Sequence, residues 1–145
     1  MAASLGGVFC DDIRHEIGGK ISLIGCYSEV MLVGKFPITL PKLCASVRAI
    51  TPADEPFKTL KIFVLKDDEV LVEGEIPCAD LPKIDPAVSN DGSLFAVNAQ
   101  FVFSPLEING PCGLRVRAEV NGDTIRGLGL RIEEASSDQD GLFRE

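Results

Sequence analysis

The stretch "LRVRAEVNGDTIRGLGLRI", which runs from Leu114 to Ile132, indicates the fold. Apolar and charged residues alternate strictly from Leu114 to Val120, and such alternation gives an extended strand one apolar and one polar face. Asn121-Gly122-Asp123 follows, and these residue types are typical of a tight turn. A second apolar run, Ile125–Ile132, comes next. The stretch therefore predicts an antiparallel hairpin with one half-buried face.

The turn of this hairpin can be placed in two ways. A two-residue loop of Asn121 and Gly122 would set Arg117 opposite Arg126. A loop shifted by one residue towards the C-terminus sets Glu119 opposite that arginine instead. Like charges on directly opposed strand positions destabilise the pair. We therefore expect the shifted loop.

Similar patterns recur along the chain, separated by turn-forming residues, with prolines at strand edges and in turns. No stretch shows a sustained helical period of 3.6 residues. Six further strands are expected, at Ile21–Tyr27, Val30–Val33, Leu43–Ile50, Leu60–Leu65, Glu69–Ile76 and Leu94–Phe103. In all, about eight or nine short strands predict an antiparallel β-sandwich, with a small β-barrel as the alternative.

The chain of 145 residues fits one domain, which we place at residues 4–132. Residues 133–145 are polar and acidic and predict a flexible tail. The longest stretch without a strand pattern is Pro77–Ser93, and loops of that length in a compact domain are often functional or mobile.

Composition argues against several classes of protein. A hydrophobic content of 46% is ordinary for a globular chain and too high for a disordered one. The net charge of −8 is unfavourable for binding nucleic acid, which needs clustered lysine and arginine. No apolar run approaches the roughly 18 residues of a membrane span, and no secretory signal opens the sequence. We expect a cytoplasmic protein that binds neither nucleic acid nor membrane.

The chain contains five cysteines, an odd number, and no Cys-x-x-Cys pair. This argues against both a disulfide framework and a zinc site. The cysteines lie in or beside apolar runs, at Cys10, Cys26, Cys44, Cys78 and Cys112. We expect reduced, structural thiols of the kind found in the cytosol.

The first candidate site is a cluster of four ionisable residues, Asp11, Asp12, His15 and Glu16. On a helix these side chains would share one face, as in a metal or acid–base site. Gly18-Gly19 and the β-rich run after it favour a strand and a tight hairpin, which divide the cluster between two faces. A two-residue turn at the glycines would set Glu16 opposite Ile21. We expect ion pairing and turn chemistry here, with metal binding as the alternative.

Acidic residues in the loops offer a second candidate, because calcium takes six to eight oxygen ligands. They are Asp54, Glu55, Asp67, Asp68, Asp80, Asp85 and Asp91. Their spacing does not match a calcium-binding loop, so solvated turns are the expectation.

Four arginines form a third candidate on the C-terminal hairpin, at Arg115, Arg117, Arg126 and Arg131. A basic strip of this kind binds carboxylate or phosphate through bidentate hydrogen bonds. A run of charges is more often a solvated face, and these arginines would equally neutralise the acidic tail.

One stretch carries a family resemblance: "FCDDIRHEIGGKISLIGCYSEV", Phe9 to Val30. Its elements Cys10-Asp11-Asp12-Ile13-Arg14 and Gly19-Lys20-Ile21-Ser22-Leu23-Ile24-Gly25, followed by a proline-bounded strand at Phe36–Leu40, resemble the opening of an uncharacterised family of small proteins of bacteria and their phages. The resemblance implies a small β-sandwich, a bacterial or phage source and no established activity. It supplies no site residues.

One histidine, no tryptophan and no recognisable nucleophile–base pair leave little for catalysis. We expect a non-enzymatic module that binds a protein partner and needs no cofactor. A ligand or metal binder that uses the acidic loops or the arginine strip is the alternative, and a hydrolytic enzyme is the least favoured reading. Exposed strand edges also allow a homodimer.

Overall fold

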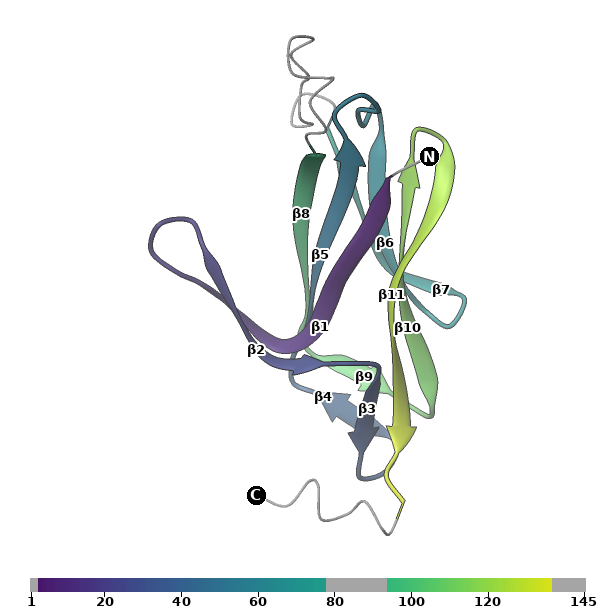
Figure 1. Ribbon diagram of the computed structural model, residues 1–145. Coiled ribbons are helices and arrows are strands. Elements are labelled where there is room, and N and C mark those ends of the chain that lie inside the picture. Colours follow the sequence, from purple (N-terminus) through teal and green to yellow (C-terminus); the bar gives the residue numbers. More distant parts are fainter. Residues whose placement is uncertain (1–2, 78–93, 137–145) are drawn as a thin grey trace. The chain divides into compact units, whose positions relative to one another are not determined.

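The computed structural model describes residues 3–77 and 94–136 (Figure 1). The strands are β1 (Ser4–His15), β2 (Ile21–Tyr27), β3 (Val30–Val33), β4 (Ile38–Leu40), β5 (Leu43–Pro52), β6 (Leu60–Lys66), β7 (Glu69–Ile76), β8 (Leu94–Phe103), β9 (Leu106–Ile108), β10 (Cys112–Val120) and β11 (Asp123–Glu134). No helix within the described residues has the length and apolar character needed to cross a membrane.

The strands form two larger sheets, with the orders β2-β1-β5-β8 and β3-β11-β10-β6-β7, and a two-stranded sheet of β4 and β9. The pairs β1–β2, β6–β7 and β4–β9 are antiparallel, whereas β3 runs parallel to β11. The fold is an all-β sandwich, as predicted from the alternation. The described strands do not close into a barrel.

The expected strands are all present, several with the expected bounds. β9 was not predicted, because three residues are too few for a two-residue period to show. β11 continues two residues past the predicted end of the domain, where Glu133 and Glu134 pair with Leu32 and Val33 of β3. Residues 78–93, which are most of the predicted loop, and residues 137–145 lie outside the described residues.

The chain divides into two compact units. Unit 1 comprises Met1–Gly7, Val47–Ala99 and Arg115–Leu128. Unit 2 comprises Val8–Ser46, Gln100–Leu114 and Gly129–Glu145. Each unit has its own set of buried side chains, and each is described separately below.

In unit 1 the core comes from alternate positions of β6 and β10, as a two-residue period requires. These side chains are at most 5% exposed and are Leu60, Ile62, Val64, Val116, Ala118 and Val120. Leu5 of β1 packs against Gly127 of β11, where a Cβ would lie 2.6 Å from the Leu5 Cδ2 atom. Gly127 therefore permits close packing that a larger residue would obstruct.

In unit 2 the fully buried large side chains include Leu43, Ile108, Leu130 and Ile132. Phe9 and Cys10 are also buried, at 2% and 0% exposure. Adjacent residues of a strand point to opposite faces, so β1 is covered on both faces at this point.

The hairpin of β10 and β11 has the loop that charge pairing disfavoured. Asn121 and Gly122 both have positive φ, 52° and 91°, and lie alone between the two strands. Cβ atoms built on Gly127 and Gly129 would meet the carbonyl oxygens of Val116 and Leu114, which confirms this register. The predicted shifted loop is therefore wrong. A two-residue loop with two positive φ angles suits Asn-Gly, and this preference outweighs the opposition of two arginines.

The hairpin of β1 and β2 also differs from its prediction by one residue. His15 pairs with Ile21, and the Glu16 amide donates to the Lys20 carbonyl at 2.8 Å. The loop between Glu16 and Lys20 is Ile17-Gly18-Gly19 rather than the two glycines alone. Both glycines have positive φ, 88° and 77°, so a three-residue loop accommodates them.

Candidate functional site

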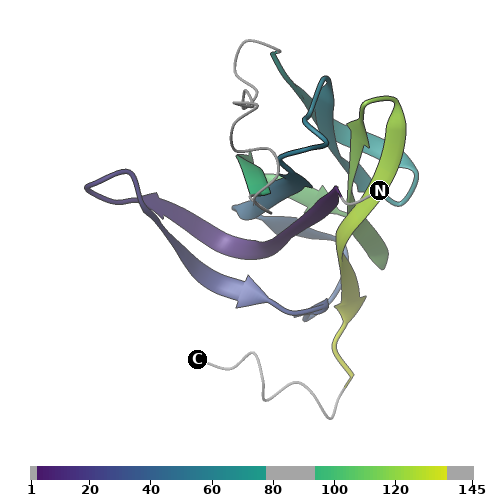
Figure 2. The ribbon, with the colours of Figure 1, turned by 45° about the horizontal axis from the view of Figure 1, so that its top comes forward.

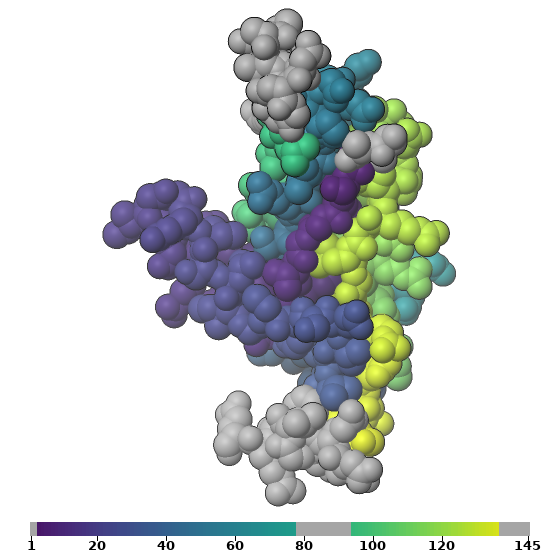
Figure 3. Space-filling model, in the orientation of Figure 1, coloured from purple at the N-terminus to yellow at the C-terminus, as the bar shows by residue number. Residues whose placement is uncertain are grey.

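The end of the β1–β2 hairpin forms an exposed arm, which we define as residues 12–24. Every residue from Arg14 to Ser22 is exposed, and the Ile17 side chain is 97% exposed. Figures 1 and 2 show this end of the hairpin standing clear of the other strands of unit 2. In the face drawn in Figure 3 it is a separate projection. The arm therefore offers its surface to solvent or to a partner.

The arm carries apolar side chains on both of its faces. The register places Ile21 and Leu23 on one face, opposite His15 and Ile13. Ile24 lies on the other face and pairs with Asp12, and it is 42% exposed. Exposed apolar residues on two faces of one ribbon are unusual for a surface that meets only water.

Two carboxylates with separate partners fix the base of the arm. The Tyr27 hydroxyl donates to Asp11 Oδ1 at 2.5 Å, and Lys42 Nζ donates to Asp12 Oδ1 at 2.6 Å. The hydrogen bond and charge of Lys42 lower the pKa of Asp12 below its usual range. Burial, together with Asp11, raises the pKa of Tyr27, so this phenol remains a proton donor at neutral pH. Asp11 thus joins the two strands of the hairpin, and Asp12 joins the hairpin to Lys42, which directly precedes β5.

Gly25 makes the Asp11 contact sterically feasible. Its φ of 68° lies in the left-handed region, and a Cβ at this position would overlap the Asp11 carboxylate. Only glycine gives both the backbone angle and the space.

The four residues of the alternative metal site are divided by this geometry. Asp11 and Asp12 have structural partners at the base, whereas His15 and Glu16 lie exposed towards the tip of the arm. Across residues 3–77 and 94–136, no three side chains of His, Cys, Asp or Glu are grouped so as to hold a metal ion.

The cysteines near the arm base are reduced in the structure. Cys10 lies directly opposite Cys26 on β2, and both are free thiols, as is Cys44. Burial, with smaller contributions from the neighbouring thiols, raises the pKa of Cys10 to about 11. Cys10 is therefore protonated at neutral pH and is a poor nucleophile. Cys78 lies outside the described residues.

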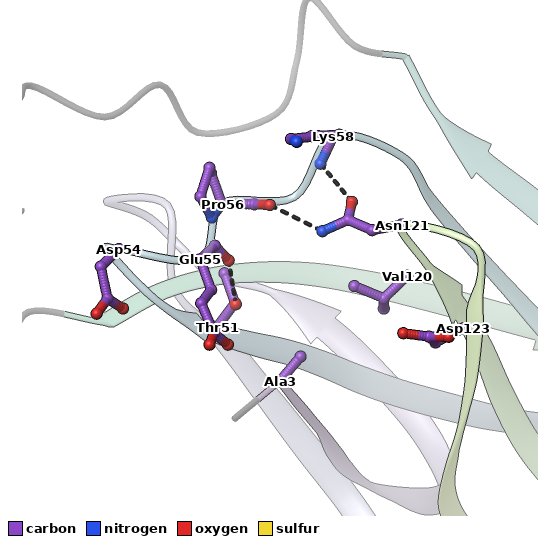
Figure 4. Close-up of a pocket in the computed structure, with 9 residues that line it drawn as sticks. All are labelled: Ala3, Thr51, Asp54, Glu55, Pro56, Lys58, Val120, Asn121 and Asp123. Carbon is purple, nitrogen blue, oxygen red and sulfur yellow. Dashed lines mark hydrogen bonds between the residues drawn. The ribbon is translucent and has the colours of Figure 1, made fainter. Parts of the chain in front are cut away.

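The acidic loops within the described residues do not gather at one place. Asp54 and Glu55, with Asp123, line a cavity of about 450 Å³ in unit 1 (Figure 4). Asp67 and Asp68 form the turn at the other end of β6, roughly 20 Å away for a seven-residue strand. The remaining loop aspartates, Asp80, Asp85 and Asp91, lie outside the described residues.

Asn121 closes one side of this cavity and is a residue that sequence reasoning missed. Its Oδ1 accepts a hydrogen bond from the Lys58 amide at 2.6 Å, and its Nδ2 donates to the Pro56 carbonyl at 3.0 Å (Figure 4). The same Oδ1 also accepts from the Thr59 amide at 3.1 Å. Its own amide donates to the Thr59 carbonyl at 3.2 Å. An asparagine before glycine in a turn was the local signal that could have singled out Asn121. Its hydrogen-bond partners could not be found in this way, because they lie more than 60 residues away in the sequence.

The structure brings together three of the four predicted arginines. Arg115 and Arg117 lie on β10 in unit 1, and Arg126 lies opposite Arg117 on β11. Burial, and then the charges of Arg126 and Arg115, lower the pKa of Arg117. Arg131 belongs to unit 2 and forms an ion pair with Glu133 at 3.5 Å.

Comparison with known proteins gives the chain a family. None of the curated proteins compared with it matches. The model of a family of unknown function matches residues 6–133, which include the arm, all four arginines and every residue of the cavity lining except Ala3. The chain therefore belongs to that family of unknown function, DUF6941.

Proposed function

We propose that this protein is a non-enzymatic binding module whose arm contacts a protein partner. The observation that carries the proposal is the exposure of Ile17, Ile21 and Ile24, at 97%, 37% and 42%, on a hairpin that stands clear of its own unit. Exposed apolar residues gathered on one element mark interaction sites.

The two-sided character of the arm supports a partner with a groove. A partner that covered one face would leave Ile21 or Ile24 in water, whereas a groove encloses both faces. β2 is also the edge strand of its sheet among the described strands, so its backbone groups can accept an added strand. The hydrogen bonds of Asp11 and Asp12 hold the arm in place before binding, which reduces the entropy lost on association.

A catalytic role finds little support in this geometry. His15, the one histidine of the chain, is exposed on the arm and makes no hydrogen bond to a carboxylate or thiol of residues 3–77 and 94–136. The opening motif supports the further proposal of an accessory factor of bacterial or phage origin, and the free thiols support a cytoplasmic location.

The test is site-specific photo-crosslinking with the full chain in an extract of its source organism. A photoreactive residue at position 17 is expected to crosslink one defined polypeptide. The same group at Val70, which is 48% exposed on another hairpin, is the matched control. Crosslinking that is equal at both positions, or that yields no defined partner, would contradict the proposal.

Ile17→Asp is expected to abolish recovery of that polypeptide while leaving the melting temperature unchanged, because the side chain touches little of its own fold. Val70→Asp should retain binding. Light scattering on the purified chain separates a foreign partner from a second copy. A dimer that Ile17→Asp converts to monomer would identify the partner as another copy of this chain.

A further inference from the structure

Arg115, Arg117 and Arg126, which we name the Arg triad, lie together on the outer face of β10 and β11. Val116 and Ala118, the residues on either side of Arg117, are fully buried, so the arginine side chains point to the opposite face. The confirmed register sets Arg126 directly across from Arg117, which places their Cβ atoms roughly 5 Å apart. Arg115 is two residues from Arg117 on the same strand and face.

Among the described residues, the three guanidinium groups of the Arg triad have no direct ion-pair partner. The Arg117 guanidinium instead donates to the Val116 carbonyl at 3.0 Å and is half-buried. Elsewhere in unit 1, Lys61 does have a carboxylate partner, Glu73, at 3.5 Å. The triad is therefore a concentrated positive site on a chain of net charge −8.

We infer that the Arg triad binds a phosphate monoester group. Guanidinium groups present paired N–H donors that match the oxygens of phosphate. A phosphate monoester carries close to two negative charges at neutral pH, whereas a carboxylate carries one. Two directly opposed arginines with a third beside them suit the doubly charged group. Its binding would also offset the charges of Arg126 and Arg115, which after burial are the causes that lower the pKa of Arg117.

The surroundings of the Arg triad argue against a nucleic-acid strand. Glu119 lies two residues beyond Arg117 on the same face, and with Glu75 and Lys61 it lines a cavity of about 260 Å³. A nucleic-acid backbone that ran past the triad would meet these carboxylates. An isolated phosphate group would not. The site therefore fits one phosphate, carried either by a small molecule or by a phosphorylated side chain.

The test is an NMR titration of the full chain with inorganic phosphate and phenyl phosphate at constant ionic strength. We expect saturable shifts of the Arg triad side-chain signals. Arg117→Gln and Arg126→Gln should each weaken phosphate binding at least tenfold. Arg48→Gln, which changes an exposed arginine on β5 of the same unit, should change it less than twofold. Arg126→Gln removes a repulsive charge, so its melting temperature should not fall.

Arg117→Lys keeps the charge and loses the paired donors, and it should weaken binding by an intermediate factor. A phosphoserine peptide that binds tighter than phenyl phosphate would identify a polypeptide as the source of the phosphate, and the reverse order would identify a small molecule. The inference would be overturned if the shifts failed to saturate, or if Arg48→Gln weakened phosphate binding as much as the triad variants do. It would also be overturned if acetate bound as tightly as phosphate, or if a single-stranded oligonucleotide bound more tightly. The arm is not involved, so this result is independent of the crosslinking experiment.

Discussion

Two glycine-containing hairpins in the described part of the chain differ in what holds their turns. The loop of β10 and β11 is anchored, since Asn121 makes four hydrogen bonds to the segment from Pro56 to Thr59. The loop of β1 and β2 is free, and Cβ atoms built on Gly18 or Gly19 would meet nothing within 4 Å. The comparison separates a turn that organises its unit from a turn that is exposed for contact.

The largest expected effect comes from the anchored turn. Asn121→Ala should lower the free energy of unfolding by about 3 kcal/mol, of which about 2 come from three lost side-chain hydrogen bonds and about 1 from alanine at positive φ. Asn121→Gly tolerates the positive φ angle, so it should lose only the contribution of the three hydrogen bonds. Urea unfolding measures both values.

Gly18→Ala on the free turn is the matched control. It carries only the cost of positive φ, about 1 kcal/mol, because it has no tertiary contact to lose. Equal losses for Gly18→Ala and Asn121→Ala would contradict the distinction between an anchored and a free turn.

The next largest effect is expected at the base of the arm. Gly25→Ala combines positive φ with displacement of the Asp11 carboxylate and loss of its bond from Tyr27, and it should cost about 2 kcal/mol. Gly6→Ala, a glycine of β1 in open space, should cost less than about 0.5 kcal/mol.

Adding Asp11→Ala to Gly25→Ala removes the overlap but not the strained backbone angle. The loss in free energy of unfolding of the double variant should therefore be smaller than the sum of the losses of the two single variants. Strict additivity, measured by the same urea unfolding, would show that Asp11 and Gly25 do not interact.

The strands could be predicted from the sequence because burial of one sheet face leaves a two-residue period, as in β10. The registers could not, because each depends on which residues of the loop take positive φ. Asn121-Gly122 is the strongest local signal for a two-residue loop, and it determines the register despite the repulsion between Arg117 and Arg126. A one-residue shift of the loop leaves the apolar pattern of the strands unchanged but changes which side chains lie opposite each other.

The candidate sites were predicted only in part, for a related reason. The Arg triad was visible because its members share one hairpin. The roles of Asp11 and Asp12 were not, because Tyr27 and Lys42 lie 16 and 30 residues further along the chain and no local pattern links them. A carboxylate cluster in sequence therefore says little about a site until the partners of each carboxylate are known.

A smaller effect, of opposite sign, is expected where the anchored turn forces two arginines together. Arg126→Gln removes a directly opposed like charge and should raise the free energy of unfolding by about 0.5 kcal/mol in low salt. The gain should shrink in about 1 M salt, where charges are screened within roughly 3 Å. A loss of stability in low salt, measured by thermal unfolding, would mean that Arg126 has a stabilising contact.

The smallest effect is expected at the base of the arm as pH changes. Lys42 lowers the pKa of Asp12 from its ordinary value of 3.8, so the folded state favours the charged carboxylate more than the unfolded state does. The resulting stability is present above that ordinary value and is lost as pH falls through the folded pKa. Lys42→Met should therefore melt slightly below the natural chain at pH 6, and the two curves should converge as the pH falls below 3.8. Because both side chains are largely exposed, the difference should be small and should diminish with salt. A difference that persisted at low pH would show that Lys42 stabilises the arm by packing of its aliphatic stem rather than by its charge.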